Sequence, residues 1–247
     1  MVEDDLEIRT SAGTSDSVIV APGRDGQWPG VIMLTDIAGI RPAFREMARR
    51  LAGAGYTVLM PNLFYRTARA PIFETMPDWN DERTRSRVAA LRTPLTPEAI
   101  ERDGSAYVDF LAAHANVSPG PLGVVGYCAA GSFAMRFAAA RPDAIAAAAS
   151  FHGGGLVVAN APNSPHTQAA KTKAQFLIAI AANDDQQRPM EKDVLKQTFA
   201  DAKLPAEIEV YTGAAHGWCP PDSGVYNEPQ AEKAWARLIA LYGKALA

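Results

Sequence analysis

The sequence predicts an α/β fold, with a mostly parallel central sheet and helices on both of its faces. Short apolar runs, typical of strands buried on both sides, recur along the chain. Segments with the 3.6-residue apolar period of an amphipathic helix separate most of these runs. Parallel neighbours need such a crossover, so the alternation predicts a parallel sheet between helices. The length of 247 residues suits one large domain or two small ones, and we expect a single domain over residues 1–247.

The first elements are predicted from β-forming residues and from a helical period. Residues 6–10 and 17–21 are rich in β-formers around Gly13, which favours a hairpin. The apolar run 30–35 reads as a strand buried in a parallel sheet. A helix is expected at about 42–54, because its apolar residues recur on one face and a glycine follows it.

The next stretch is less regular. An apolar strand at 56–60 stops at a proline, and segment 61–95 then combines several prolines with a charged run. We expect this segment to be an irregular excursion on the substrate side, because long excursions above a sheet often form part of a substrate site. A helix at about 96–114 follows, with Thr96 as its N-cap and Pro97 at its first position.

A strand, a sharp turn and a helix are predicted around Cys128. The apolar run 121–125 leads into Gly126, and an alanine-rich helical segment follows Cys128 through Ala140. Small residues on both sides of the cysteine suit a strained turn that lifts its side chain above the sheet. This is the geometry of a nucleophile elbow, here with cysteine in place of serine. A lone cysteine in an alanine-rich segment is otherwise a small buried hydrophobe.

The last elements continue the alternation. Apolar strands are expected at 144–151, 176–181 and 206–211, and helices at about 190–202 and 229–246. Because the carboxyl ends of parallel strands meet at one edge of a sheet, residues that follow these strands are expected to lie close together.

Four polar residues follow predicted strands in this way, namely Asp36, Cys128, Asp184 and His216. The order nucleophile, acid, histidine is that of the α/β-hydrolase triad, so this fold and a catalytic triad of Cys128, Asp184 and His216 are predicted. The histidine would activate the thiol, and the carboxylate would orient the histidine. The neighbouring Asp185 remains an alternative candidate for the acid, although the length of the preceding strand favours Asp184.

Backbone amides are predicted to complete the site. An oxyanion hole needs fixed N–H donors, and we expect them at Ala129, after the nucleophile, and at Ile37, in the turn after the first core strand. His152 also follows a strand, but it precedes the acid in the chain and is read as a structural or pocket residue. Cys219 is interpreted as a packing residue. It lies three residues after His216, and this one spacing is not enough to indicate a metal site.

Composition excludes several classes of function. A formal net charge of −3 gives no electrostatic case for binding nucleic acid or an anionic membrane, and no apolar run has the length of a membrane span. The acidic N-terminus lacks the features of a signal peptide, and two cysteines make no disulfide framework, so a cytoplasmic location is expected. No glycine-rich loop that could bind phosphate groups follows the first strand, so we do not expect a dinucleotide-binding site. We expect a small-molecule partner, no cofactor, no metal, and a monomer or homodimer.

Several motifs resemble those of the dienelactone hydrolase family, from about residue 30 to the last helix. Gly126-Tyr127-Cys128 matches its elbow, and the segments 34–39, 55–63 and 213–217 resemble its first turn, its "GY…PDL" strand and its histidine loop. Together these motifs are specific. Two positions depart from the family: Asp36 stands where a glutamate is usual, and Ala130 replaces a glycine.

The resemblance implies a cofactor-free hydrolase of the enol lactone 4-carboxymethylenebut-2-en-4-olide, formed in catechol breakdown. In such enzymes the glutamate of the turn pairs with the resting thiol, and substrate binding frees this carboxylate to help form the thiolate. By position, Asp36 would take this role here. Arginines hold the substrate carboxylate in the family, and Arg83 and Arg85 are the nearest matches. A solvated charge run is the alternative for both. Tyr127 and Trp218, beside the elbow and the histidine in sequence, are also predicted to bind substrate.

Two other functions are compatible with the sequence. One is a general carboxylesterase acting on aryl or short acyl esters. The other is a non-catalytic small-molecule binder or a thiol redox sensor on the same fold, although a sensor needs only a thiolate and not the acid and base around it. The sequence therefore favours a hydrolase of a small activated ester or lactone that works through a thioester on Cys128.

Overall fold

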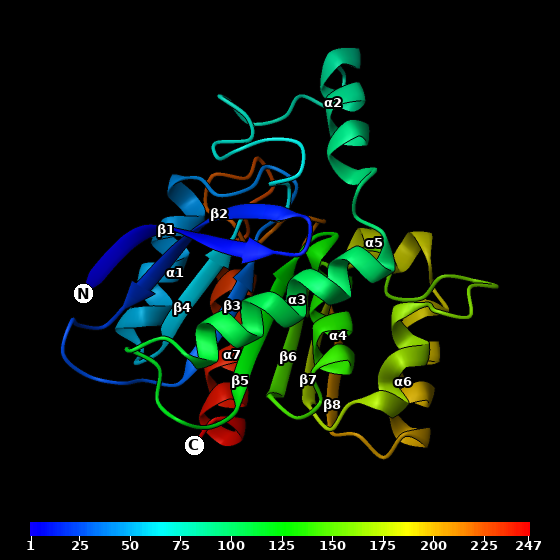
Figure 1. The fold of residues 1–247 in the computed structure, drawn as a ribbon. Coiled ribbons are helices and arrows are strands. Elements are labelled where there is room, and N and C mark those ends of the chain that lie inside the picture. The colour runs from blue at the N-terminus through cyan, green and yellow to red at the C-terminus, as the bar shows by residue number, and fades with distance from the viewer.

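The computed structural model describes all residues, Met1–Ala247, and has a single sheet of eight strands in the order β1-β2-β4-β3-β5-β6-β7-β8 (Figure 1). The strands are β1 (Val2–Thr10), β2 (Gly13–Ala21), β3 (Gly30–Leu34), β4 (Thr57–Pro61), β5 (Leu122–Tyr127), β6 (Ile145–Phe151), β7 (Gln175–Ala181) and β8 (Ala206–Tyr211). The six strands β4-β3-β5-β6-β7-β8 are parallel to one another, whereas β1 and β2 form an antiparallel hairpin at one edge, with β2 antiparallel to β4. The predicted α/β-hydrolase fold is confirmed.

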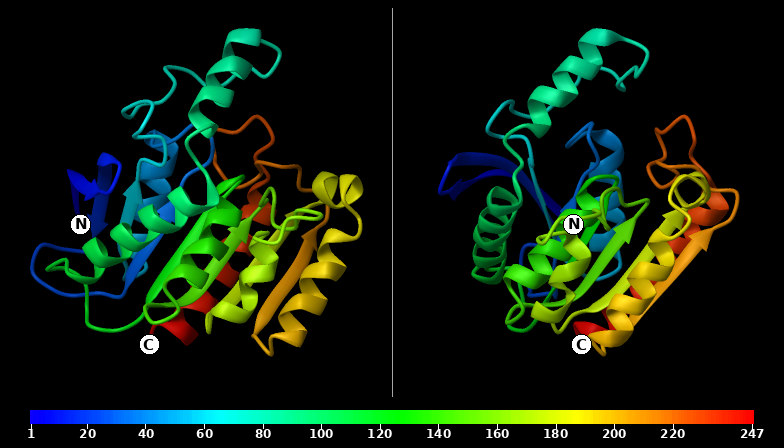
Figure 2. Two further views of the ribbon diagram at one scale, coloured as in Figure 1. Left: turned by 45° about the vertical axis from the view of Figure 1, so that its right-hand side comes forward. Right: turned by 90° about the vertical axis from the view of Figure 1, so that its right-hand side faces the viewer.

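Helices cover both faces of the sheet (Figure 2). They are α1 (Pro42–Gly53), α2 (Glu82–Arg92), α3 (Pro97–Ala112), α4 (Ala130–Ala140), α5 (Ala182–Gln187), α6 (Glu191–Asp201) and α7 (Glu228–Ala245), with a short 3-10 helix at Pro165–Lys171. Helices α3, α4 and α6 lie on one face, and α1 and α7 lie on the other. None of the helices is long and apolar enough to span a lipid bilayer.

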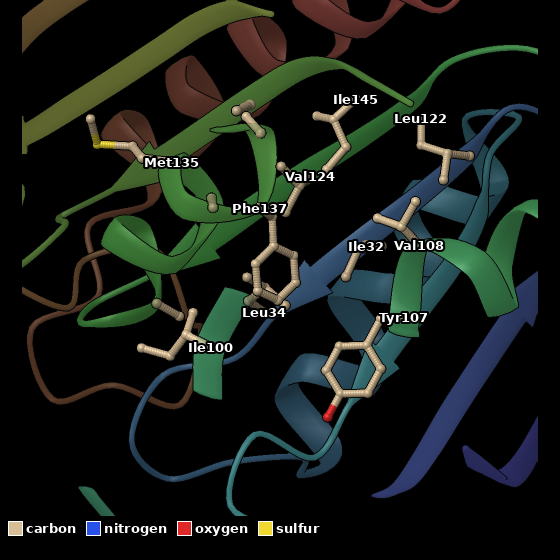
Figure 3. Close-up of a cluster of buried hydrophobic side chains, with 14 of the residues drawn as sticks. Ile32, Leu34, Ile100, Tyr107, Val108, Leu122, Val124, Met135, Phe137 and Ile145 are labelled. Carbon is tan, nitrogen blue, oxygen red and sulfur yellow. The ribbon is translucent and has the colours of Figure 1, made fainter. Parts of the chain in front are cut away.

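Each layer of helices buries its own apolar core against the sheet. On the α3 and α4 side, Val124 of β5 and Phe137 of α4 belong to the core cluster shown in Figure 3, together with Tyr107 of α3. On the other side Phe44 of α1 and Leu238 of α7 are fully buried. Burial on both faces explains why the central strands are continuous apolar runs in the sequence.

Segment 61–95 differs from the expected irregular excursion, because it contains α2. Asp81 caps this helix by accepting hydrogen bonds from the backbone N–H groups of Arg83 and Thr84. Only Val88 and Leu91 of the helix are buried, so α2 lacks the wide apolar face by which a helix is recognised in a sequence. Figures 1 and 2 show α2 projecting beyond the carboxyl ends of the strands.

Helix α5 was also not predicted from the sequence. It has six residues and begins directly after β7, in a stretch that reads as a polar loop. Its first turn carries two aspartates, which are favourable near a helix N-terminus. The consequence for the site is that Asp184 and Asp185 point in different directions, since neighbouring residues on a helix do not face the same way.

Candidate active site

The strand β5, Cys128 and the helix α4 form a sharp elbow. Cys128 has a φ of 57°, a left-handed conformation that is uncommon for a residue with a side chain. A Cβ on Gly126 would lie 1.9 Å from the carbonyl oxygen of Ala130, and one on Gly131 would lie 2.2 Å from Ser150 Oγ. Glycine is therefore required at both positions. Ala130, where the family has glycine, is the first residue of α4 and is buried without distorting the helix.

A chain of hydrogen bonds links Cys128, His216 and Asp184. Cys128 Sγ lies 3.2 Å from His216 Nε2, and His216 Nδ1 lies 2.7 Å from Asp184 Oδ2. The loop after β8 that carries His216 is fixed by its backbone N–H, which donates to Asn183 Oδ1 on α5. The three predicted triad residues are thus in contact in the order that a nucleophile, a base and an orienting acid require.

The two adjacent aspartates have different surroundings. Asp184 is 7% exposed and faces His216. Asp185 accepts a hydrogen bond from Lys192 Nζ at 2.7 Å and makes no contact with the histidine. The structure therefore brings Asp184, and not Asp185, to the histidine, which is the choice that strand length favoured.

His216 has a strongly altered pKa. Burial lowers it, but the hydrogen bonds and negative charges of Asp184 and Cys128 outweigh burial and raise the pKa to about 10. A raised pKa favours the protonated form of the imidazole. An imidazolium beside the sulfur stabilises a thiolate, which is the nucleophilic form of cysteine.

We expect Cys128→Ala to lower the pKa of His216 below about 10, because the variant removes one of the two groups that stabilise the imidazolium. The pKa can be measured by NMR titration of the histidine ring signals, with His216→Gln used to assign the resonance. His166 serves as an internal control, since its ring bonds to Ser164 Oγ and not to the site. An unchanged His216 titration in Cys128→Ala would show that the thiol does not interact with the ring.

A cavity of about 460 Å³ opens in front of Cys128 and His216. Ile37 and Ala129 both line it. Neither of their N–H groups donates a hydrogen bond within the protein, so both are available to a ligand. This is the arrangement that a predicted oxyanion hole requires, with two unpaired donors beside the nucleophile.

Asp36 lies at the edge of this cavity but does not bond to Cys128. Its two oxygens accept hydrogen bonds from Arg41 at 2.7 and 3.0 Å, and Oδ1 also accepts from the N–H of Ala38. Arg41 simultaneously donates to both oxygens of Asp222 at 2.7 and 3.0 Å. The pairing of thiol and carboxylate expected by analogy with the family is therefore replaced by a bridge from Asp36 through Arg41 to Asp222.

The four residues predicted to bind substrate do not line the cavity. Arg83 and Arg85 are exposed on the projecting helix α2, and Arg85 donates to the carbonyl oxygens of Trp79 and Asn80. Tyr127 and Trp218 are buried to 1% and 0% exposure. Tyr127 packs edge-on against Phe44 and Phe151 on the α1 and α7 side of the sheet. Trp218 packs behind His216, stacked on Tyr211 and edge-on to His152.

Two other arginines line the cavity, and the sequence did not point to them. Arg92 lies at the C-terminal end of α2, and Arg188 follows α5. The Arg188 guanidinium lies beside two carboxylates, with its Nε 3.1 Å from Glu191 Oε2 and an Nη 4.0 Å from Asp184 Oδ1. In the sequence, the sign that Arg188 belongs to the site is its position four residues after Asp184. Residues four apart are neighbours only on a helix, so this spacing is informative only if residues 182–187 are known to be helical.

Known proteins are similar to this chain over most of its length. A family model described as "Dienelactone hydrolase family" matches residues 16–246. A carboxymethylenebutenolidase from Rhodococcus opacus is 30% identical over 226 residues, which cover 90% of this chain and 83% of that protein.

Solved structures share the fold over the full length. A provisionally named dienelactone hydrolase from Klebsiella pneumoniae subsp. pneumoniae MGH 78578 superposes with a TM-score of 0.83 at 24% identity, over 98% of both chains. A dienelactone hydrolase-like promiscuous phosphotriesterase, P91 from metagenomic libraries, superposes with a TM-score of 0.82 at 19% identity, over 100% of this chain and 99% of that chain.

Proposed function

Because this chain belongs to the dienelactone hydrolase family and is thus a carboxylic ester hydrolase, we propose that it cleaves a small activated ester or lactone through a thioester on Cys128. The observation that carries the proposal is the hydrogen-bonded chain from Cys128 through His216 to Asp184, which faces a cavity with two unpaired N–H groups. A packing cysteine needs neither a charged partner nor a cavity.

In the acylation step the Cys128 thiolate attacks the carbonyl carbon of the substrate. The electron pair of the carbonyl moves to its oxygen, which is stabilised by the N–H groups of Ile37 and Ala129. The tetrahedral intermediate then collapses to a thioester, and the leaving oxygen takes the proton from His216 Nε2. An enolate leaves readily because its charge is delocalised, which suits the lactone implied by the family.

In the deacylation step the neutral His216 acts as a base. The acylated Cys128 no longer raises the pKa of His216, so the histidine stays neutral after giving its proton to the leaving oxygen. His216 takes a proton from water, and the resulting hydroxide attacks the thioester. The thiolate leaves, the acid product departs, and the ion pair is restored.

The cavity also favours a substrate with a negative charge. Two arginines, Arg92 and Arg188, line it, against the single carboxylate of Asp36, which is already paired with Arg41. Arginine binds carboxylates through paired N–H donors. The Rhodococcus relative is named for a butenolide that carries a carboxymethylene group. We therefore propose Arg188 and Arg92, in place of Arg83 and Arg85, as the groups that bind a substrate carboxylate.

Asp36 has a different role in this proposal from that of the family glutamate. Its carboxylate accepts from the N–H of Ala38 and from Arg41, and so it holds the turn that presents the N–H of Ile37. The thiol is already paired with His216 and does not need to be released from a carboxylate. Asp36 thus supports the oxyanion hole rather than switching the nucleophile.

The test of the proposed function compares two substrates and detects the acyl-enzyme. We expect hydrolysis of 4-carboxymethylenebut-2-en-4-olide with a higher kcat/KM than that of p-nitrophenyl acetate. Rapid acid quenching should trap an acyl group on the peptide that contains Cys128, detectable by mass spectrometry. A preference for the aryl ester would favour the general carboxylesterase. Ready alkylation of Cys128 with no turnover of either substrate would favour the binder or thiol sensor.

We expect Arg188→Gln to lower kcat/KM for the lactone by roughly 10-fold or more, the usual effect of losing a hydrogen bond to a charged group. The rate with uncharged p-nitrophenyl acetate should stay within about twofold, because that substrate has no carboxylate to bind. Steady-state kinetics on both substrates measure the difference. Arg83→Gln, on the exposed face of α2, is the matched control and should affect neither. Equal losses on both substrates would contradict carboxylate binding by Arg188.

A further inference from the structure

His152 lies directly behind the candidate triad and has no assigned role there. It follows β6 and has a φ of 43°, an uncommon left-handed conformation for a residue with a side chain. Its backbone N–H donates to the carbonyl oxygen of Ala179 on β7, and its ring is 0% exposed. Strained residues that persist near a reactive group are held there by their surroundings, and such strain is frequent at active sites.

One nitrogen of the His152 ring bonds to the elbow itself. Nδ1 accepts a hydrogen bond from the backbone N–H of Cys128 at 3.1 Å. The same N–H lies 3.2 Å from the carbonyl oxygen of Phe151, so the amide of Cys128 is held by two acceptors from the end of β6. These contacts fix the backbone that sets the direction of the Cys128 side chain.

The ring also packs against the catalytic base. It stands edge-on to the His216 ring, with the centroids 5.1 Å apart and the planes at 64°. On another side it stands edge-on to Trp218 at 5.0 Å and 71°. The His216 ring is thus in contact with Asp184 at Nδ1 and with the His152 ring.

The chemistry of the contact requires a neutral ring. An Nδ1 that accepts a hydrogen bond carries no proton, so the proton is on Nε2. Nε2 is buried and has no hydrogen-bond partner. Burial and the nearby His216 lower the pKa of His152 well below its ordinary value, so it stays neutral beside a charged histidine. A buried unpaired N–H is unfavourable, which argues against a residue kept for packing alone.

We propose that His152 is a positioning residue that fixes both the Cys128 backbone and the His216 ring, and so maintains the 3.2 Å contact between Sγ and Nε2. The inference rests on the proposed function of Cys128 as the nucleophile. His152 would affect the rate by keeping Sγ and Nε2 at the right distance, because a small misplacement of reacting groups can lower the rate by a large factor.

Two kinds of variant distinguish the effect of the hydrogen-bond acceptor at Nδ1 from the effect of the volume of the ring. His152→Asn keeps an oxygen near the position of Nδ1 and tolerates the left-handed backbone. His152→Leu has a similar volume but no acceptor, and His152→Gln, which places its oxygen farther out, replaces the leucine variant if that protein does not fold. His166→Leu, another histidine whose Nδ1 is hydrogen-bonded, is the matched control outside the site.

The readouts are kcat and KM for p-nitrophenyl acetate, the rate of Cys128 alkylation by iodoacetamide, and the thermal midpoint. We expect His152→Leu to lower kcat by roughly 10- to 100-fold with little change in KM, and to slow alkylation of Cys128. His152→Asn should recover most of both rates, and His166→Leu should match the wild type. Equal kcat values for the leucine and asparagine variants, or losses that follow only the thermal midpoint, would overturn the proposal.

The result also distinguishes this inference from the proposed function. If Cys128→Ala is inactive while His152→Leu keeps the wild-type kcat and alkylation rate, Cys128 is the nucleophile and only the positioning role of His152 is wrong. If Cys128→Ala retains turnover, the proposed function is wrong and the positioning role falls with it.

Discussion

Cys128→Ala is expected to lower kcat/KM for an activated ester by roughly 10⁴-fold or more, the loss typical of removing one member of a catalytic triad. Without the sulfur, His216 has no nucleophile to activate and no thioester forms. The cavity and the N–H groups of Ile37 and Ala129 remain, so substrate binding should persist with a residual rate from attack by water. Steady-state kinetics and equilibrium binding of the product separate the two effects.

Cys219→Ala is the matched control for this variant. Cys219 is the only other cysteine, is 7% exposed, and does not line the cavity in front of Cys128. Its replacement should leave kcat/KM within a few-fold of the wild type, and any change in thermal midpoint reports the cost of removing a small buried side chain. A Cys128→Ala protein with more than about a hundredth of the wild-type rate would be incompatible with a triad nucleophile.

Asp184→Asn is expected to lower kcat by roughly 10⁴-fold, the effect of the same change in a serine triad. The carboxylate accepts from His216 Nδ1 at 2.7 Å and so determines which nitrogen faces Cys128. An amide in its place can donate to Nδ1 and stabilise the wrong tautomer. The variant also removes a group that raises the pKa of His216, so the imidazolium beside the thiol is weakened. Stopped-flow or steady-state hydrolysis measures the loss.

Asp185→Asn provides a control at the neighbouring position. Its partner is Lys192, and surface ion pairs of this kind contribute little. We expect kcat within about twofold of the wild type and a thermal midpoint close to it. The assignment of Asp184 as the acid is wrong if Asp185→Asn causes the larger loss.

The sheet and the contact among the three triad residues could be predicted from the sequence because they depend on local patterns. Apolar runs identify the strands, and parallel strands place the residues that follow them at one edge. Gly126 and Gly131 mark the elbow, since a side chain at either position would collide with α4 or β6. The position of Asp184 followed from the length of the strand before it.

The residues that contact substrate could not be predicted in this way, because their positions depend on where helices project. The charged run of Arg83 and Arg85 lies on an exposed helix that leads away from the cavity, while Arg92 at its base returns to the cavity. Arg188 depends on a short helix with no apolar period. Tyr127 and Trp218 are near catalytic residues in sequence but point into the core.

The role of Asp36 shows a different limit. Its position after β3 was predicted from the sequence, but its partner was not, because the two carboxylates that Arg41 binds are far apart in the chain. Whether a carboxylate in this turn contacts a thiol or an arginine depends on packing between the first turn and a segment near the C-terminus. Nothing in the sequence of either segment indicates that the two are in contact.

The bridge from Asp36 through Arg41 to Asp222 has a consequence for redesign of the enzyme. It joins segments 181 positions apart, so the turn after β3 and the segment after the histidine loop behave as one module. A library that recombines one without the other would leave the nearly buried guanidinium with one carboxylate fewer. Loop exchange among relatives should therefore transfer residues 36–41 and 216–222 together.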